Sequence, residues 1–349
     1  MAKNENEVSN STATVTAYTL AIGAVGAAIA WSLGFPVFLI TGPALLLSLV
    51  GVTGLPLKIS TNVRDIAFLF IGLSIGAGVD AQAADAFLRW PLAFLALAGM
   101  LTVALWASQL MLNRLFGFDP ATAVLAATPG HLSFVIGLGE SENADTTKII
   151  VTQSVRLLAL TLTVPFIAML LGVDFNAGIL PNGITMSAIN VLILLALAIP
   201  LGLLLKHFKT PAGLLIGAMI VSSIGHLSDL TPGRLTPYIA LPGFLVIGTL
   251  IGSRFSGITL EQLRRYLLAG LTTTALTVGI AILVALPVAT FLDMPLVHVL
   301  VAFAPGGLET MIAMGAVLGA NAGFIAACHV GRLLFLTVLV PAMLVHARR

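Results

Sequence analysis

The stretch Phe68–Gly76, FLFIGLSIG, recurs 176 residues later as Phe244–Gly252, FLVIGTLIG. Six of the nine positions are identical. The same offset pairs Pro129-Gly130 with Pro305-Gly306, Gly139 with Gly315, Arg156-Leu157-Leu158 with Arg332-Leu333-Leu334, and Pro165 with Pro341. Because the offset is held through Gly, Pro and Arg, and not only through common apolar residues, the sequence predicts one unit used twice.

The composition places the chain in a membrane. Of its 349 residues 58% are hydrophobic and only 9% are charged, with a mean hydropathy of +1.09, whereas soluble domains carry about a quarter charged residues. Apolar runs long enough to cross a bilayer as helices recur along the chain, and they lack the two-residue alternation of barrel strands. We therefore expect an all-α, polytopic transmembrane bundle in the lipid of a bacterial inner membrane.

The apolar runs divide the chain into two homologous halves. We expect a polar, disordered cytoplasmic tail over 1–14, a first repeat over 15–172, a linker over 173–185 and a second repeat over 186–346. About 10–12 helices are expected, from segments near 15–34, 36–53, 63–80, 90–115, 120–138, 148–172, 186–206, 211–228, 235–254, 266–291, 295–316 and 320–346. No loop is long enough to form a soluble domain, so the function should lie within the membrane.

Basic residues in the loops bear on how the halves are oriented. If all twelve segments cross, seven basic residues fall on each side, which gives no orientation signal. If the second half is inverted, nine fall inside: Lys3, Lys58, Arg64, Arg114, Lys206, Lys209, Arg254, Arg264 and Arg265. The five left outside are Arg89, Lys148, Arg234, Arg348 and Arg349. We favour inverted repeats, which require that one segment of each half does not span.

The fifth segment of each half is interrupted. Ala126–Ser133 reads AATPGHLS and Ala302–Glu309 reads AFAPGGLE. Proline and glycine in mid-segment break the helix, which a bilayer tolerates only where the backbone is buried in protein or lines a cavity. Matched breaks in two halves indicate a transporter binding site. The candidate binding residues at the breaks are Pro129, Gly130, His131, Pro305, Gly306 and Gly307.

Arg156 and Arg332 lie deep in the sixth segments, where an unpaired guanidinium costs about 2.5–3.5 kcal/mol or more. Two interpretations are open at this point. The arginines either pair structurally with a carboxylate or with carbonyls freed by the break, or they clamp an anionic substrate. Both interpretations place them at the centre of the protein.

Three further polar residues lie near these arginines. Glu309 follows the second break and is the candidate for binding a coupling proton or Na⁺, whereas the first half has Ser133 there. His329 and Gln153 occupy equivalent positions one helical turn before the arginines and are expected to share their face. The Gly72–Gly76 and Gly248–Gly252 pairs have the spacing that allows close helix packing.

Other chemistries find little support. Cys328 is the only cysteine, so an intrachain disulfide and a CxxC metal site are excluded. No basic cluster suits nucleic acid. No histidine–carboxylate triad at ligand spacing is visible, so we expect no metal, no cofactor and no catalytic residues.

Several motifs together resemble the AbrB-type bacterial membrane proteins. These motifs are GPA at Gly42–Ala44, IGxxIG in both halves, APGGLETM at Ala304–Met311 and HVGRLL at His329–Leu334. The resemblance covers residues 20–346, and members are labelled ammonia monooxygenases or AbrB family regulators. It also implies a distant tie to the cation:proton antiporter and anion transporter superfamily, whose folds have inverted repeats and two crossed, broken helices. On that analogy, the helices would cross at the two breaks.

The sequence favours a secondary transporter of a small anionic or carboxylate solute, coupled to H⁺ or Na⁺, with a homodimer as a further expectation. One alternative is a membrane-embedded regulator that acts on gene expression through a partner. The least favoured alternative is an ammonia monooxygenase, because such an enzyme needs a metal or organic cofactor.

Overall fold

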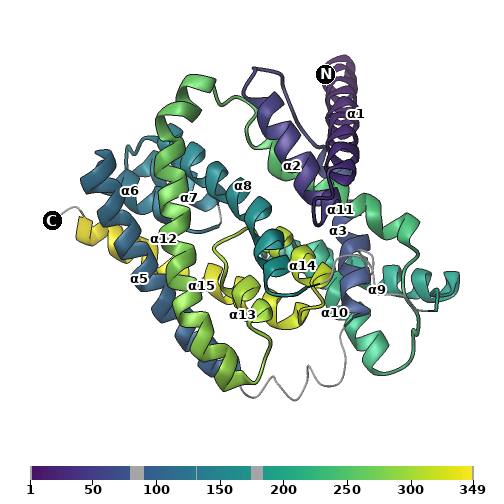
Figure 1. Ribbon diagram of the computed structural model, residues 1–349. Coiled ribbons are helices and arrows are strands. Elements are labelled where there is room, and N and C mark those ends of the chain that lie inside the picture. The colour runs from purple at the N-terminus through teal and green to yellow at the C-terminus, as the bar shows by residue number, and fades with distance from the viewer. Residues whose placement is uncertain (1, 79–89, 131, 174–183, 348–349) are drawn as a thin grey trace.

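The computed structural model describes residues 2–78, 90–130, 132–173 and 184–347 (Figure 1). Within these ranges there are fourteen helices and no strand. The first half contains α1 (Ala2–Ser32), α2 (Phe38–Gly51), α3 (Thr61–Gly76), α5 (Trp90–Phe116), α6 (Pro120–Ala127), α7 (Leu132–Ser141) and α8 (Thr146–Leu170). The second half contains α9 (Ala188–His207), α10 (Gly213–Leu227), α11 (Pro237–Ser253), α12 (Leu260–Leu292), α13 (Leu296–Phe303), α14 (Leu308–Val317) and α15 (Ala322–Ala347).

The helices confirm the prediction of an all-α membrane bundle. Among the described residues, six helices are long and apolar enough to cross a membrane, namely α1, α5, α8, α9, α12 and α15. The fifth segment of each half is interrupted as expected, because α6 and α7, and likewise α13 and α14, are separate short helices.

The beginning of α1 differs from the expected disordered tail. The backbone is already helical at Ala2, although the part that could cross a membrane starts at Thr12. No glycine or proline interrupts the sequence before Gly23, so the helix can continue through the polar stretch. Most of the linker expected over 173–185 lies outside the described ranges.

The helices form two bundles, and each bundle draws on both halves of the chain. We call α1, α2, α3, α9, α10 and α11 the scaffold bundle, and α5–α8 with α12–α15 the hairpin bundle. Contacts are dense within each bundle and sparse between them, where they join α2 to α8, α11 to α8 and α14, and α14 to α3. In Figure 1 most of the scaffold bundle lies on the right and most of the hairpin bundle on the left.

The scaffold bundle is held together by the duplicated glycines. A Cβ atom added to Gly248 of α11 would lie 2.5 Å from the carbonyl oxygen of Ile40 in α2, and one added to Gly72 of α3 would clash with that of Leu215 in α10. Because glycine has no side chain, the helix backbones can touch at these positions. The packing role predicted for both glycine pairs is therefore confirmed.

The same contacts give the helix directions. Along α3, Gly72 meets Leu215 and Gly76 meets Met219, so α3 and α10 run parallel. By the same reasoning α11 runs parallel to α2, because Gly248 meets Ile40 and Gly252 meets Ala44. In contrast, α1 and α2 are antiparallel, because Gly23 meets Leu47 while Gly26 meets Gly42.

The path of α3 shows that the two halves are inverted. α3 starts level with the end of α2, where the Ser60 amide donates to Thr16 Oγ1 of α1 (3.0 Å). Further along, the Ala67 carbonyl lies beside Gly243 of α11, level with the start of α2. Thus α3 runs antiparallel to α2 and parallel to α10. The third helix of one copy runs with the second helix of the other, as inverted repeats require.

The broken segment of the first half is a re-entrant hairpin. At the start of α8 the Asp145 amide donates to Thr122 Oγ1 of α6 (2.9 Å), and further along Gln153 Nε2 donates to the Leu125 carbonyl (3.1 Å). Hence α8 runs parallel to α6 from the same end, and α7 must return to that end. Because the hairpin does not cross, α1, α2, α3, α5 and α8 remain as the continuous described helices of this half, an odd number that fits the inversion.

The second half repeats this local geometry. The Ala320 amide donates to the Gly315 carbonyl, as the Ala144 amide does to that of Gly139. Asn321 Oδ1 accepts from the Phe324 amide at the start of α15, as Asp145 Oδ1 accepts from the Lys148 amide at the start of α8. The breaks are therefore the tips of two hairpins rather than the crossing points of two broken helices that the family resemblance implied.

One end of the molecule, which we call the basic end, collects most of the loop cations. Phe118, after α5, contacts Lys148 at the start of α8 (5.2 Å from Nζ to the ring) and Tyr266 at the start of α12 (6.0 Å between rings). The helix directions then place at this end Lys58, Arg64, Arg114, Lys148, Lys206, Lys209, Arg254, Arg264 and Arg265. Among the described loops, Arg234 lies at the opposite end. The orientation count had placed Lys148 on the side opposite to these residues. It lies here because the hairpin does not cross, so α8 begins at the end where α6 begins.

Candidate functional site

Each buried arginine binds the hairpin tip of its own half. Arg156 of α8 donates from Nη1 to the Ala127 carbonyl (3.2 Å) and from Nη2 to that of Thr128 (2.9 Å). Arg332 of α15 donates to Ala304 and Gly306 (both 2.7 Å). These carbonyls are free because the short helices end there. Of the two interpretations of the arginines, the structural pairing with freed carbonyls is therefore present.

The two tips meet in the interior of the protein. A Cβ atom added to Gly130 would lie 3.4 Å from Leu333 Cδ2 and 3.6 Å from Arg332 Nη2, both from the other half. A Cβ atom added to Gly307 would lie 3.5 Å from Leu157 Cδ2. Each tip thus packs against the residue that follows the arginine of the opposite half, and both guanidinium groups lie close to the junction.

The arginines keep unused hydrogen-bonding capacity. Both side chains are 1% exposed, and a guanidinium carries five N–H donors, of which each donates two to carbonyls in the described part of the chain. Neither Nε has a hydrogen-bond partner among the described residues. Two buried cations with incomplete pairing are costly unless a further anionic group or water compensates them.

A cavity of about 620 Å³ lies between the scaffold and hairpin bundles. Its lining includes both tips, at Gly130 and Gly307, and the two arginines. The scaffold bundle contributes the ends of α3, α9, α10 and α11. The charged residues of the lining are Arg64, Asp65, Arg156, Lys206, Lys209, Arg254, Glu309 and Arg332.

The two acidic residues of the cavity are both in ion pairs. Asp65 accepts from Arg64 Nη2 (2.8 Å) and from Lys206 Nζ (2.7 Å). Glu309 Oε1 lies 3.6 Å from Arg254 Nη2, and this pair links α14 to the end of α11. The exposed ammonium of Lys209 has no ion pair with the carboxylates of the described residues. The cavity therefore carries a surplus of positive charge.

The remaining predicted polar site residues differ from the arginines in their partners and in whether they line the cavity. Gln153 ties α8 to α6 through the Leu125 carbonyl, although it also lines the cavity. His329 is fully buried beside the backbone of Ile325 and Ala302, and it does not line the cavity. His131 lies outside the described residues. The geometry therefore places His329 away from the cavity and leaves the prediction for His131 as a prediction.

At each break one glycine, rather than the proline, lines the cavity. Gly130 and Gly307 line the cavity, whereas Pro129 and Pro305 do not. The backbone carbonyl of Gly306 binds Arg332, and a side chain there would clash with Met311.

Five charged residues line the cavity at its edge near the basic end, which we call the rim, and were not predicted as site residues. They are Arg64, Asp65, Lys206, Lys209 and Arg254. In the sequence they read as ordinary loop cations and their partner. The sequence feature that could have identified them was the clustering of basic residues on one side in the inverted arrangement.

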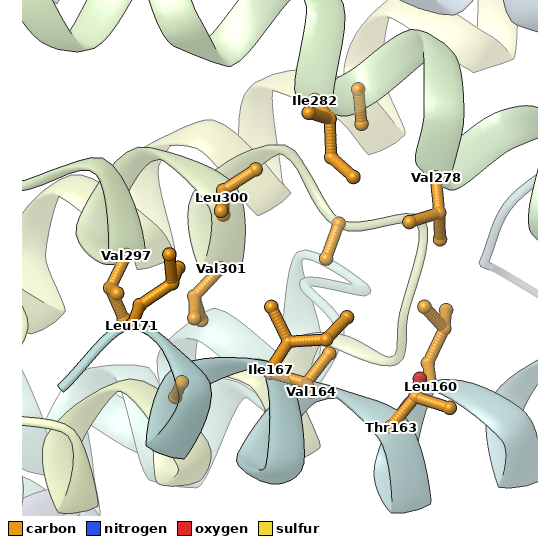
Figure 2. A pocket seen from close by; sticks show the side chains of 13 residues that line it. Leu160, Thr163, Val164, Ile167, Leu171, Val278, Ile282, Val297, Leu300 and Val301 are labelled. Carbon is orange, nitrogen blue, oxygen red and sulfur yellow. The ribbon is translucent and has the colours of Figure 1, made fainter. Parts of the chain in front are cut away.

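A second pocket is lined almost entirely by apolar side chains. It measures about 50 Å³ and lies between α8, α12 and α13, where Figure 2 shows Val164 and Ile167 near Val301. Its lining carries no charged residue, and Thr163 is its polar member. A pocket of this size and lining does not suit an anionic solute.

Within residues 2–78, 90–130, 132–173 and 184–347, no three His, Cys, Asp or Glu side chains gather closely enough to hold a metal ion. The cavity lining holds six guanidinium or ammonium groups, two carboxylates, the Gln153 amide and the hydroxyls of Thr210 and Ser253. The cationic groups outnumber the carboxylates. Such cationic groups bind anions by charge-assisted hydrogen bonds.

Comparison with known proteins gives a family. Over 251 residues, 67% of this chain, the sequence is 24% identical to "Uncharacterized protein YhjN" of Bacillus subtilis (strain 168), and the match spans 65% of that protein. Over 103 residues it is 37% identical to "Putative regulator AbrB" of Escherichia coli (strain K12), a match that spans 29% of each chain. The family model described as "Transition state regulatory protein AbrB" matches residues 39–347, nearly the whole duplicated region. The chain therefore belongs to the AbrB family.

Proposed function

We propose that the chain is a secondary transporter of a small anionic solute that binds in the central cavity. The observation that carries the proposal is a cavity of about 620 Å³ with six basic and two acidic residues in its lining, built at the meeting point of two broken segments. Its volume lies in the range of about 300–1,000 Å³ that small-molecule sites occupy. Sites at paired helix breaks between inverted repeats are typical of secondary transporters.

The division into two bundles supports alternating access. Each hairpin tip belongs to the hairpin bundle, whereas the rim cations Arg64, Lys206, Lys209 and Arg254 belong to the scaffold bundle or its adjoining loops. Because contacts between the bundles are sparse, the bundles can shift against each other around a bound solute.

The loop charges support a cytoplasmic opening for this conformation. Cytoplasmic loops of membrane proteins carry an excess of Lys and Arg, and the rim cations lie at the basic end. We expect a cysteine introduced at Ser253, in the cavity lining, to react with a membrane-impermeant maleimide in inside-out vesicles and not in intact cells. Arg234→Cys, at the opposite end, should show the reverse pattern. The buried native Cys328 should give a low background, and equal labelling of Ser253→Cys from both sides would contradict the assignment.

Transport itself is tested in proteoliposomes. Proteoliposomes should take up isotope-labelled inorganic or organic anions that empty liposomes exclude. The Glu309–Arg254 pair is the proposed coupling element, because it joins the second tip to the scaffold bundle. Glu309→Gln should still bind the solute but lose accumulation driven by an imposed pH or Na⁺ gradient, and comparing the two gradients identifies the coupling ion. A wild-type protein that takes up none of the anions, with or without an imposed gradient, would remove the transporter proposal.

A regulatory role is the second candidate, and it rests on the names of the family and of the Escherichia coli relative. The described residues offer no soluble domain beyond the membrane helices, so regulation would act through solute flux or through a partner. Crosslinking that captures one defined partner, together with absent flux, would favour it over transport. The ammonia monooxygenase label gains no support from the donor set described above.

A further inference from the structure

We infer that the solute carries at least two anionic groups, as a dicarboxylate or a larger polycarboxylate does. The inference rests on the proposed function and specifies the substrate class of the same cavity. It follows from which charges of the cavity are already paired and from where the unpaired ones lie.

The pairing leaves three cations available. Asp65 is held by Arg64 and Lys206, and Glu309 is held by Arg254. Among the charged residues described in the lining, Arg156, Arg332 and Lys209 then have no carboxylate partner. A singly charged solute could pair with one of these cations and would leave a buried guanidinium or the rim ammonium without an anionic partner.

The three cations lie at two depths. Arg156 and Arg332 are 1% exposed and bind the hairpin tips, so they form the floor of the cavity. Lys209 is exposed and follows α9 at the basic end, so it lies at the rim. A solute with one carboxylate at each end can neutralise the floor and the rim together, whereas a monocarboxylate reaches one of them.

Carboxylate is the anionic group that suits this floor best. Each guanidinium keeps N–H donors that the backbone does not use, and planar guanidinium groups bind carboxylates through paired N–H bonds. A spherical inorganic anion has no second anionic group to place beside Lys209.

The test compares a mono-, a di- and a tricarboxylate on the purified full-length chain. Thermal unfolding is followed against butyrate, succinate and tricarballylate at matched ionic strength, with sulfate and phosphate as inorganic anions. We expect succinate or tricarballylate to reach half of its maximal stabilisation at a concentration at least tenfold lower than butyrate does. Lys209→Gln should weaken binding of the di- and tricarboxylate about tenfold and leave that of butyrate unchanged.

Arg264→Gln is the matched control, because it removes one exposed positive charge at the same end but outside the cavity lining. It should behave like the unaltered protein, which also separates binding from general salt effects on stability. If butyrate stabilises as strongly as succinate, or if Lys209→Gln changes nothing, the two-anion inference is wrong while anion transport stands. If no anion stabilises the protein more than sodium chloride of the same ionic strength does, both proposals are overturned.

Discussion

Arg332→Ala is expected to lower the unfolding temperature of the purified protein and to abolish solute transport. The substitution leaves the carbonyls of Ala304 and Gly306 without their shared donor in a buried site. Each buried acceptor that loses its partner costs about 1–3 kcal/mol, so a loss of about 2–6 kcal/mol is expected. The second tip would lose its fixed geometry, and the cavity would lose half of its floor charge. Thermal unfolding in detergent and uptake of labelled solute into proteoliposomes measure the two effects.

Arg332→Lys separates charge from geometry. Lysine keeps the positive charge, but its ammonium lacks the planar fork with which arginine reaches two carbonyls at once. We expect intermediate stability and weakened transport. Arg156→Ala should reproduce the loss at the first tip, whereas Arg264→Ala on the exposed face of α12 should change neither property. Unaltered stability of Arg332→Ala would show that the guanidinium does not hold the tip.

The repeat in the sequence located the centre of the site but not its shape. Offsets between the halves identified the two breaks and the two arginines, and their contacts with each other's halves confirm that they converge. The sequence could not distinguish a crossing helix from a hairpin, because a Pro-Gly break permits both. The contact that decides it, between Asp145 and Thr122, joins residues from separate helices.

The arginines show a second limit of the sequence. Their partners are backbone carbonyls at 127, 128, 304 and 306, and a carbonyl has no side chain that a sequence pattern could reveal. The structural and ligand-binding interpretations were therefore equally supported. The rim cations were invisible for a related reason. Lys206 of α9 meets Asp65 of α3 because α9 packs against α10 and α10 packs against α3, and the contact of α3 with α10 depends on glycines from both halves.

Gly248→Ala is expected to destabilise the scaffold bundle although it adds a single methyl group. The new Cβ would lie 2.5 Å from the Ile40 carbonyl oxygen and 2.8 Å from the Ile40 Cα. Both are backbone atoms, so no side-chain rotation relieves the clash, and α2 and α11 would have to separate. Overpacking of this kind costs about 1–3 kcal/mol or more. Gly72→Ala, at the equivalent contact of α3 with α10, should have a similar effect, and thermal unfolding of both variants measures it.

Two glycines elsewhere in the helices make the comparison decisive. Gly99 in α5 and Gly279 in α12 have no heavy atom within 4 Å of an added Cβ atom. There alanine should be neutral or stabilising by up to about 1 kcal/mol, because alanine favours helix more than glycine does. Opposite signs at contact and non-contact glycines would show that backbone approach holds the inverted halves together. If all four substitutions shift stability in the same direction, helix propensity accounts for the glycines and the close packing of the two halves does not.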